Sequence, residues 1–201
     1  MYHPIHRATF DLSPLVGSNY FLRVNNLIFI GFASCGKSAT AYEIAKRLGL
    51  KFVDLDKEIE VRYYLSHNKE LHYRQIILQE GVECFLHLEK TVLDEFLRCR
   101  DCVIAPGGGA PMNEENRAVL ARLGTIVYLK TEPDVLLERM QSKGLPLFLN
   151  GQADINHLQT IWQERHGVYQ QLAQCTIENS LLSISETAEA VIAALKHNML
   201  L

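Results

Sequence analysis

Hydrophobic positions along this chain follow two alternating patterns. From residue 27 onward, short apolar runs are separated by longer segments in which apolar residues recur every three or four positions. The short runs predict buried strands, and the longer segments predict amphipathic helices. The predicted strands are 27–30, 52–54, 102–106, 126–129 and 175–178. The predicted helices are 37–48, 84–98, 114–122, 133–142, 156–173 and 185–197.

Short apolar strands that alternate with helices predict an α/β fold in which helices cover both faces of a parallel sheet. The first 26 residues show neither period, and they contain two prolines and a glycine. We therefore divide the chain into an N-terminal extension, 1–26, and one domain, 27–201. With 201 residues and 48% hydrophobic content, the chain can bury one sizeable core.

Composition narrows the class of partner. The formal net charge is −3 and the charges are not clustered, which argues against nucleic acid and against a membrane surface. The five cysteines are an odd number, and no charged-then-apolar leader precedes the domain, so we expect a reduced, cytoplasmic protein. We also expect a monomer or weak oligomer. Cys99 and Cys102 form a single CxxC; packing is favoured over zinc because no further ligands lie at suitable spacing.

A phosphate-binding loop is predicted by GFASCGKS at 31–38, which fits GxxxxGK[ST] and stands between an apolar strand and a helix. Consecutive backbone N–H groups at a helix N-terminus bind anions, and glycines let the phosphates approach closely. In this pattern Lys37 reaches the β- and γ-phosphates and the Ser38 hydroxyl ligates Mg²⁺. The alternative is a chance glycine turn, which the flanking elements argue against. The loop therefore predicts ATP and Mg²⁺ as ligands.

A pair of carboxylates follows the second predicted strand. Asp54 and Asp56 are separated by one residue, and at strand spacing both can face the crevice at the carboxyl edge of the sheet, where α/β folds bind ligands. One can serve a metal and the other a substrate hydroxyl. The alternative is that either aspartate caps the helix that runs through Ile59.

Three glycines, Gly107, Gly108 and Gly109, follow the third predicted strand. Such a run is costly in backbone entropy and is typical of a place where another group approaches the main chain. A tight turn before the next helix is the alternative. Because the carboxyl end of this strand lies at the same edge as the phosphate loop, we favour a ligand-binding turn.

Together these motifs make the chain resemble the shikimate kinase family, within the nucleoside-monophosphate-kinase branch of P-loop folds. The resemblance begins near Leu27 and extends almost to the C-terminus, and its order of motifs is more specific than the phosphate loop alone. The matching residues are GFASCGKS at 31–38, FVDLD followed by Ile59 and Glu60, Gly81 with Phe85 and Glu89, the triple glycine, Asn116 and Arg117, Val127 to Leu129, Pro133, Arg139, Pro146 and Leu147, Glu164 and Arg165, and Tyr169.

The resemblance implies a three-layer P-loop kinase fold with a five-stranded parallel sheet of order 2-3-1-4-5. It also implies an acceptor-binding region near 55–85, a lid near 143–157, and phosphoryl transfer from ATP to a hydroxyl of a small polar acceptor, shikimate. By resemblance the catalytic residues are Lys37, Asp54 and Asp56, with Asp54 ordering the metal and Asp56 orienting or deprotonating the hydroxyl. The implied nucleotide-binding residues are Gly31, Ser34, Cys35, Gly36, Lys37, Ser38, Ala39 and Arg139, the metal residues are Ser38 and Asp54, and the acceptor residues are Asp56, Gly107, Gly108, Gly109 and Arg165.

Several positions depart from the family pattern. An arginine that pairs with the acceptor carboxylate is replaced by Leu86, and the lid arginine that reaches the transferring phosphoryl group is replaced by Leu145. Ser34 stands where the loop usually has another glycine, Val82 replaces a glutamate, and the segment 61–80 is several residues longer than is typical.

These departures leave two hypotheses open. The first is a kinase for shikimate or another hydroxylated metabolite, and the second is a nucleotide-binding protein that has lost catalysis. The retained Lys37, Ser38, Asp54 and Asp56 favour the kinase, whereas the two leucines favour the alternative. The candidates for a replacement donor are Arg62, His72, Arg74, His87 and Lys143, although each is of a type usually found as a solvated surface group.

Overall fold

The computed structural model describes residues 26–149, 151 and 154–197, without the side chain of Lys143. The predicted extension therefore lies outside the described residues, except for Asn26. No helix in the described part of the chain is both long and apolar enough to cross a bilayer.

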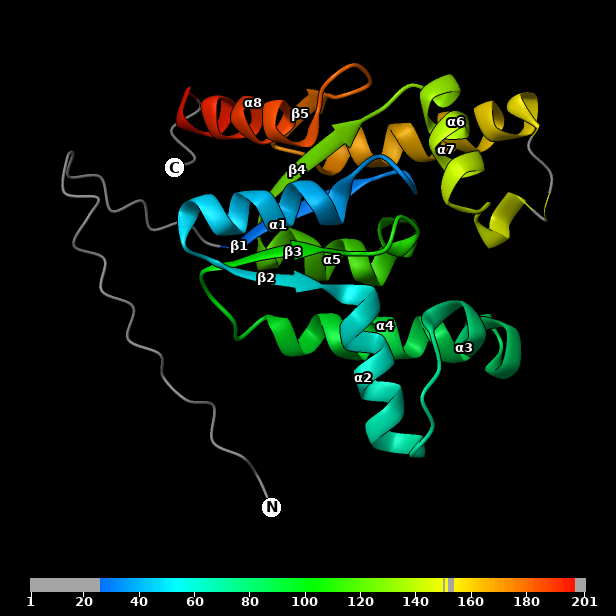
Figure 1. The fold of residues 1–201 in the computed structure, drawn as a ribbon. Helices are drawn as coiled ribbons and strands as arrows, with labels where there is room; N and C mark the ends of the chain where they lie inside the picture. Colours follow the sequence, from blue (N-terminus) through cyan, green and yellow to red (C-terminus); the bar gives the residue numbers. More distant parts are fainter. Residues whose placement is uncertain (1–25, 150, 152–153, 198–201) are drawn as a thin grey trace.

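A five-stranded parallel sheet forms the centre of the domain (Figure 1). Its strand order is β2-β3-β1-β4-β5, so the expected order 2-3-1-4-5 is confirmed. The strands are β1 (Asn26–Gly31), β2 (Lys51–Asp54), β3 (Cys102–Ala105), β4 (Gly124–Lys130) and β5 (Cys175–Glu178). Each predicted strand is present, with ends that shift by one or two residues.

Helices cover both faces of this sheet, which confirms the three-layer arrangement (Figure 1). One face carries α1 and α8, which contact each other, and the other carries α5 and α7. Beyond β2, the α2, α3 and α4 helices pack together, with α4 also against α5. The helices are α1 (Lys37–Leu48), α2 (Leu55–His67), α3 (Tyr73–Glu80), α4 (Val82–Phe96), α5 (Glu114–Leu123), α6 (Pro133–Lys143), α7 (Ile155–Leu172) and α8 (Ile184–His197).

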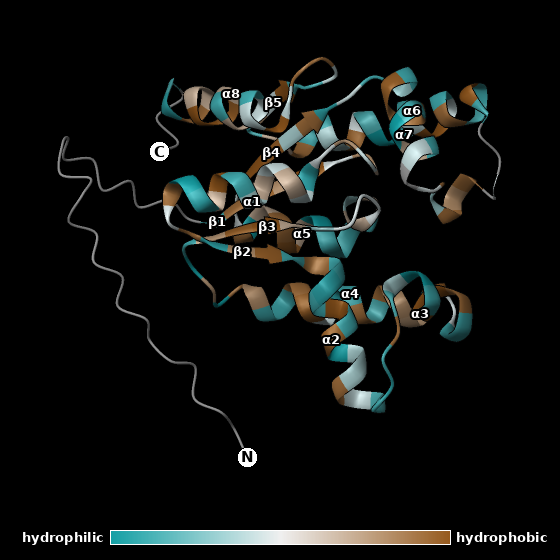
Figure 2. Cartoon of the chain, viewed as in Figure 1, coloured by the Kyte–Doolittle hydropathy of each residue, from teal (hydrophilic) through white to brown (hydrophobic). Residues whose placement is uncertain are grey.

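Burial explains why the strand prediction succeeded. β1 and β3 are buried along their whole length, because both lie inside the sheet and are covered on both faces. Figure 2 shows the strands as mainly hydrophobic, whereas hydrophilic and more hydrophobic residues alternate along α1. Asn26 is a buried exception: its Nδ2 donates to the carbonyls of Cys99 and Leu123, and its Oδ1 accepts from the N–H of Cys102. These bonds tie the start of β1 to the loop that precedes β3.

Two helices, α2 and α3, were not predicted at their observed length. The buried positions of α2 are Leu55, Ile59 and Tyr63, which recur every four residues as a helix requires. However, apolar residues on its exposed side, Val61 and Leu65 among them, obscure this period in the sequence. α3 is only eight residues long and buries Ile76 alone. Neither helix therefore gives the regular apolar pattern by which longer helices are found.

Candidate functional site

The predicted phosphate-binding loop connects β1 to α1 at the carboxyl edge of the sheet. Lys37 is the first residue of α1, and its side chain folds back across the loop. Its Nζ donates to the carbonyl oxygens of Gly31, at 3.0 Å, and Phe32, at 2.8 Å. The only ammonium of the loop is thereby held over the concave side of the turn, while Ser38 and Ala39 in the first turn of α1 remain exposed.

Left-handed backbone at two places shapes this loop. Gly36 has φ of 98° and Ser34 has φ of 64°, a region that glycine enters without steric cost and that serine enters only with strain. The departure at Ser34 thus places a side chain where the backbone favours glycine. Gly31 is needed for a different reason, since a Cβ there would lie 2.6 Å from the carbonyl oxygen of Leu129. The glycines of the loop pattern are therefore needed to avoid crowding within the protein as well as to bind phosphate.

Asn179, which follows β5, braces the loop from behind. Its buried Nδ2 donates to the carbonyl of Cys35 at 2.8 Å, and its Oδ1 accepts from the Thr131 hydroxyl at 2.5 Å. Arg139 joins the same group, since its Nη2 donates to the carbonyls of Asn179 and Ser180 at 3.4 and 3.2 Å. Sequence reasoning missed Asn179, because one polar residue after a strand gives no signal of its own.

Asp54 and Asp56 occupy different kinds of backbone, and this corrects the argument made from strand spacing. Asp54 ends β2 and is the N-cap of α2, and its Oδ1 accepts from the N–H groups of Asp56 and Lys57 at 3.1 and 3.4 Å. Asp56 already lies in the first turn of α2. The capping alternative is therefore correct for Asp54. The two carboxylates are brought near each other by the strand-to-helix turn.

The glycine turn after β3 lies close to Asp56 and to the phosphate loop. A Cβ on Gly107 would lie 3.0 Å from Oδ1 of Asp56, and one on Gly108 would lie 3.1 Å from the N–H nitrogen of Ala33 in the phosphate loop. Gly109 has open space in this position. The carbonyl of Gly108 accepts from the hydroxyl of buried Tyr169 at 2.6 Å. A side chain at Gly107 would press on the carboxylate of Asp56, and one at Gly108 would press on the backbone of the phosphate loop.

Glu89 on α4 is a second carboxylate beside Gly107. Its Oε1 would lie 3.5 Å from a Cβ on that glycine, and only 2% of the residue is exposed. Its Oε2 accepts from Nδ2 of buried Asn116 at 2.9 Å. Both residues belong to the motifs that carry the family resemblance, yet no role was assigned to them from the sequence. Burial next to Asp56 makes Glu89 part of the site.

Burial sets the protonation of this carboxylate pair. Loss of water, and to a lesser degree the nearby charge of Asp56, raises the pKa of Glu89 to about 8, against the opposing effect of the Asn116 hydrogen bond. Burial and the charge of Asp54 raise the pKa of Asp56 to about 6, although Lys37 acts in the opposite direction. Near neutral pH, Asp56 is therefore mostly ionised while Glu89 retains its proton. One base and one neutral acid border the same glycine.

Arg165 on α7 lies against two aromatic rings at the site. Its guanidinium carbon lies 5.1 Å from the ring centroid of Phe32 and 4.7 Å from that of Phe148. The two rings meet edge to face with centroids 5.4 Å apart. Phe148 belongs to the segment between α6 and α7, so Arg165 rests on contacts from the phosphate loop and from the predicted lid. Cation–π contacts of this kind hold the guanidinium in place.

The residues present suit Mg²⁺ chemically. Mg²⁺ prefers oxygen ligands, keeps several waters, and is usually held by one or two carboxylates together with substrate phosphates. Ser38 offers a hydroxyl at the loop, and Asp54 and Asp56 offer carboxylates. Within the described ranges no three acidic, histidine or cysteine side chains form a group that could hold a metal alone. This pattern fits a metal that is bound together with a nucleotide.

Comparison with known proteins decides the family. The model of the family described as shikimate kinase matches residues 33–196. The chain belongs to the shikimate kinase family. Members of this family are small-molecule kinases that transfer phosphate from ATP to a hydroxyl. The shikimate kinase of Ralstonia nicotianae is 32% identical over 178 residues, 87% of this chain and 89% of the relative. That of Chromobacterium violaceum is 33% identical over 161 residues, 80% and 84% of the two chains.

Solved structures agree with this assignment. The shikimate kinase from Acinetobacter baumannii, determined in complex with shikimate, superposes with a TM-score of 0.79 at 28% identity, covering 89% of this chain and 96% of that one. A gluconokinase from Sinorhizobium meliloti superposes with a TM-score of 0.52 at 16% identity, covering 88% and 94% of the two chains, which shows likeness of fold alone. The expected fold of a P-loop kinase is thus confirmed.

Proposed function

We propose that this protein transfers the γ-phosphoryl group of ATP to a hydroxyl of shikimate, giving ADP and shikimate 3-phosphate. The observation that carries this proposal is the meeting of three loops: Lys37 on the phosphate loop, Asp56 after β2, and Gly107 after β3 lie at one edge of the sheet. Membership of the shikimate kinase family supports the same acceptor. An ATP site and a carboxylate base that border one glycine turn provide what phosphoryl transfer requires.

Each residue has a distinct part in the proposed reaction. The loop N–H groups and Lys37 bind the phosphates, and Lys37 neutralises charge that builds up on them. Asp56 accepts the proton of the acceptor hydroxyl while that oxygen forms its bond to the γ-phosphorus. The bond from the γ-phosphorus to the β–γ bridging oxygen breaks, and the electron pair leaves with ADP. Gly107 and Gly108 leave room for the acceptor, and Arg165 pairs with its carboxylate.

Ser38 and Asp54 are the proposed holders of Mg²⁺. When bound with ATP, the ion would neutralise phosphate charge. The oxygen of the Ser38 hydroxyl and the carboxylate of Asp54 supply ligands of the type that Mg²⁺ prefers. Asp54 also caps α2 through its Oδ1, so the same side chain orients Asp56 two residues later. Arg139 is proposed to lie against the adenine, since its guanidinium is fixed to the carbonyls that follow β5.

The alternative, a nucleotide-binding protein without catalysis, is not favoured. It rests on the loss of arginine at Leu86 and Leu145, whereas the phosphate loop, the ionised Asp56 and the family membership all agree with an active kinase. We further propose that the enzyme acts in the cytoplasm as a monomer or weak oligomer.

Release of ADP in Mg²⁺-ATP, measured with and without shikimate, tests the proposed function. We expect ADP to form at a rate that saturates with shikimate, and phosphorus NMR to show one phosphate monoester. Gluconate, a hydroxy acid without the ring, serves as the control acceptor. Shikimate-independent ADP release, or release driven equally by gluconate, would contradict the proposed acceptor. Absence of nucleotide binding at tens of micromolar, an affinity of about −6 kcal/mol, would contradict the kinase itself.

A further inference from the structure

The proposed acceptor carries a carboxylate, and its site is rich in acidic groups. Asp56 and Glu89 border the glycine turn, and Lys37 is already bonded to the phosphate loop. Arg165 is then the one cation so far placed against the acceptor. A single cation is a weak counterpart for an anion that must enter a site lined by acidic side chains, because a charge removed from water needs compensating partners. A second cation in the described part of the site is therefore expected on electrostatic grounds.

Arg74, near the start of α3, occupies a suitable position. Its Nη1 donates to the carbonyl of Leu145 at 3.5 Å, its Nε donates to the hydroxyl of Tyr73 at 3.1 Å, and its guanidinium lies 5.8 Å from the centroid of that ring. The side chain is half-buried. No carboxylate among the described residues lies within ion-pair distance of it. Arg74 is thus held in place by neutral groups, and its charge is not neutralised by an acidic neighbour.

The neighbours of Arg74 are parts of the proposed site. The ring of Tyr73 lies 6.3 Å from that of Phe85, the residue that precedes Leu86 on α4. Leu145 directly precedes the turn that runs from Pro146 to Leu149, in which the N–H of Leu149 donates to the carbonyl of Pro146 at 3.1 Å. Phe148 in that turn carries Arg165 on its ring. Arg74 and Arg165 therefore both contact the short segment 145–148, Arg74 at Leu145 and Arg165 at Phe148.

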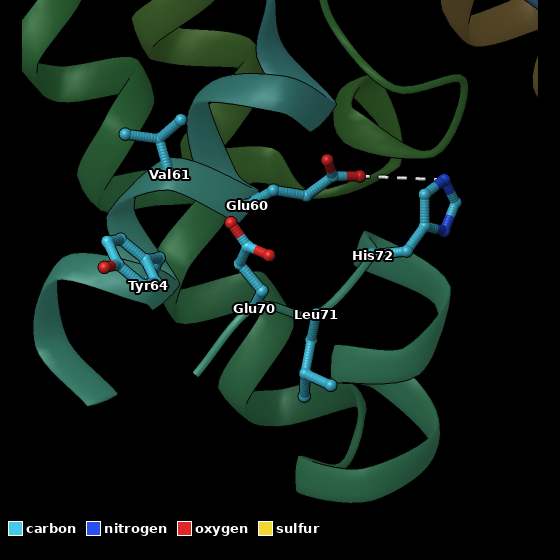
Figure 3. A pocket seen from close by; sticks show the side chains of 6 residues that line it. All are labelled: Glu60, Val61, Tyr64, Glu70, Leu71 and His72. Carbon is cyan, nitrogen blue, oxygen red and sulfur yellow. Dashed lines mark ion pairs between the residues drawn. The ribbon is translucent and has the colours of Figure 1, made fainter. Parts of the chain in front are cut away.

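Three other cationic candidates, Arg62, His72 and His87, face elsewhere, and the side chain of Lys143 lies outside the described residues. Arg62 forms an ion pair with Glu95 between α2 and α4. His72 caps α3, and its Nε2 lies 3.6 Å from Oε1 of Glu60 at a surface hollow of about 360 Å³ (Figure 3). His87 is exposed on α4. Each of these groups has an acidic partner or is open to water, so none matches the position of Arg74.

We propose that Arg74 is the second cation that binds the carboxylate of the acceptor, together with Arg165. This inference rests on the proposed function and specifies how this chain recognises an anionic acceptor. A guanidinium presents several N–H donors in a plane, so one edge can bond to the Leu145 carbonyl while another binds a carboxylate. The lengthened segment between α2 and α3 thereby contributes a specificity-determining residue that Leu86 on α4 does not supply.

Steady-state kinetics of Arg74→Gln and Arg74→Lys test this role. We expect Arg74→Gln to raise the KM for shikimate about ten- to a hundredfold, as loss of one charge-assisted hydrogen bond predicts, with kcat and the KM for ATP within about twofold of wild type. Arg74→Lys keeps the charge without the planar fork, so its KM for shikimate should lie between those of wild type and Arg74→Gln. Arg62→Gln is the matched control, because Arg62 pairs with Glu95 away from the turn. Calorimetry with shikimate should give the same ranking.

The carboxamide of shikimate separates charge recognition from packing. Wild type should bind the acid more tightly than the amide, and Arg74→Gln should lose most of that preference while its amide affinity is unchanged. An unchanged KM for shikimate in Arg74→Gln would overturn the inference and leave the proposed function intact. Equal loss of acid and amide, or a fall in kcat alone, would also overturn it. If wild type neither binds nor phosphorylates shikimate, the proposed function and this inference fail together.

Discussion

The two halves of the site are built in different ways. The nucleotide half consists of backbone turned by glycines, one lysine bonded to that backbone, and Asn179 behind it. The acceptor half consists of side chains from several helices, among them Glu89 on α4, Arg74 on α3 and Arg165 on α7. A backbone cradle tolerates little change in spacing, whereas a charge can be moved from one element to another. This difference explains why the phosphate loop keeps its spacing, with Ser34 as its one named departure, whereas the acceptor half has lost charged side chains at Leu86 and Leu145.

The largest effect is expected at the nucleotide half. Lys37→Ala removes the only ammonium of the loop and its hydrogen bonds to the carbonyls of Gly31 and Phe32. We expect kcat/KM to fall by about 10³–10⁵, the range seen when a cation on the transferring group is lost. ADP release and calorimetry with ATP measure the two losses. Lys46→Ala, on the exposed side of α1, is the control, and retained ATP affinity in Lys37→Ala would contradict the proposed contact.

A change at Asp56 should separate chemistry from nucleotide binding. Asp56→Asn removes the base, so turnover should fall by about 10²–10⁴ while ATP affinity stays close to wild type. The wild-type rate should also fall as pH decreases through about 6, because burial raises the pKa of Asp56 to that value and the protonated form accepts no proton. Asp94→Asn, exposed on α4, is the control. Equal loss of ATP binding would instead assign Asp56 to the metal or to the fold.

Arginine introduced at the two departures should act on different constants. Leu145→Arg, next to the turn, should raise kcat by about tenfold or more, a part of what an arginine on the phosphoryl group can contribute, with little change in the KM for shikimate. Leu86→Arg should lower that KM by about tenfold with kcat unchanged, since a charge-assisted bond contributes about 1.5–3 kcal/mol.

The effect of Leu86→Arg on the KM for shikimate should depend on whether Arg74 is present. In the Arg74→Gln background, Leu86→Arg should restore more of the lost shikimate affinity than it adds to wild type, because it then supplies the second cation. Leu181→Arg, at a residue that is 94% exposed, controls for added charge alone. A rise in kcat from Leu86→Arg, or a KM effect from Leu145→Arg, would show that the two positions do not act separately.

The smallest effect concerns stability at the acceptor half. The folded protein holds the proton of Glu89 up to a pKa of about 8, whereas an ordinary glutamate releases it near 4.5. Between these values the folded state binds more protons than the unfolded state, so this group lowers stability as pH rises and has no further effect above the folded pKa. Glu89→Gln should therefore gain a few degrees in Tm relative to wild type between pH 5 and pH 9. Thermal melts of Glu83→Gln, at an exposed position, give the reference. A Tm difference between Glu89→Gln and wild type that stays constant with pH would contradict the raised pKa of Glu89.

The features that the sequence predicted are those whose buried residues recur at regular spacing along the chain. All five strands were predicted, because buried parallel strands are short apolar runs, whereas the sheet order was implied by the family resemblance and not by these runs. The crowding of Gly31 and Gly108 could also be anticipated from glycines at strand ends. In contrast, α3 is too short, and the exposed side of α2 too apolar, to show a clear helical period in the sequence. Asp54 caps α2, a role that the strand-spacing argument did not favour.

Some site contacts had no local signal. Asn179 and the phosphate loop are far apart in the chain, and Arg74 reaches the carbonyl of Leu145 across 71 positions. Such pairs are fixed by the way helices pack, so the sequence named Arg74 only as one of several cations. Burial and partners distinguish it from Arg62 and His72, and both properties exist only in the folded molecule.

The bond from Asn179 to Cys35 has a consequence for synthesis of the protein. It joins residues 144 positions apart, and β5, which places Asn179, is the last strand of the sheet to emerge from the ribosome. A nascent chain that ends before β5 can form β1 and α1, but it lacks the brace behind the loop. Competence for ATP should thus arise late in translation, when almost the whole domain is available to fold around the nucleotide.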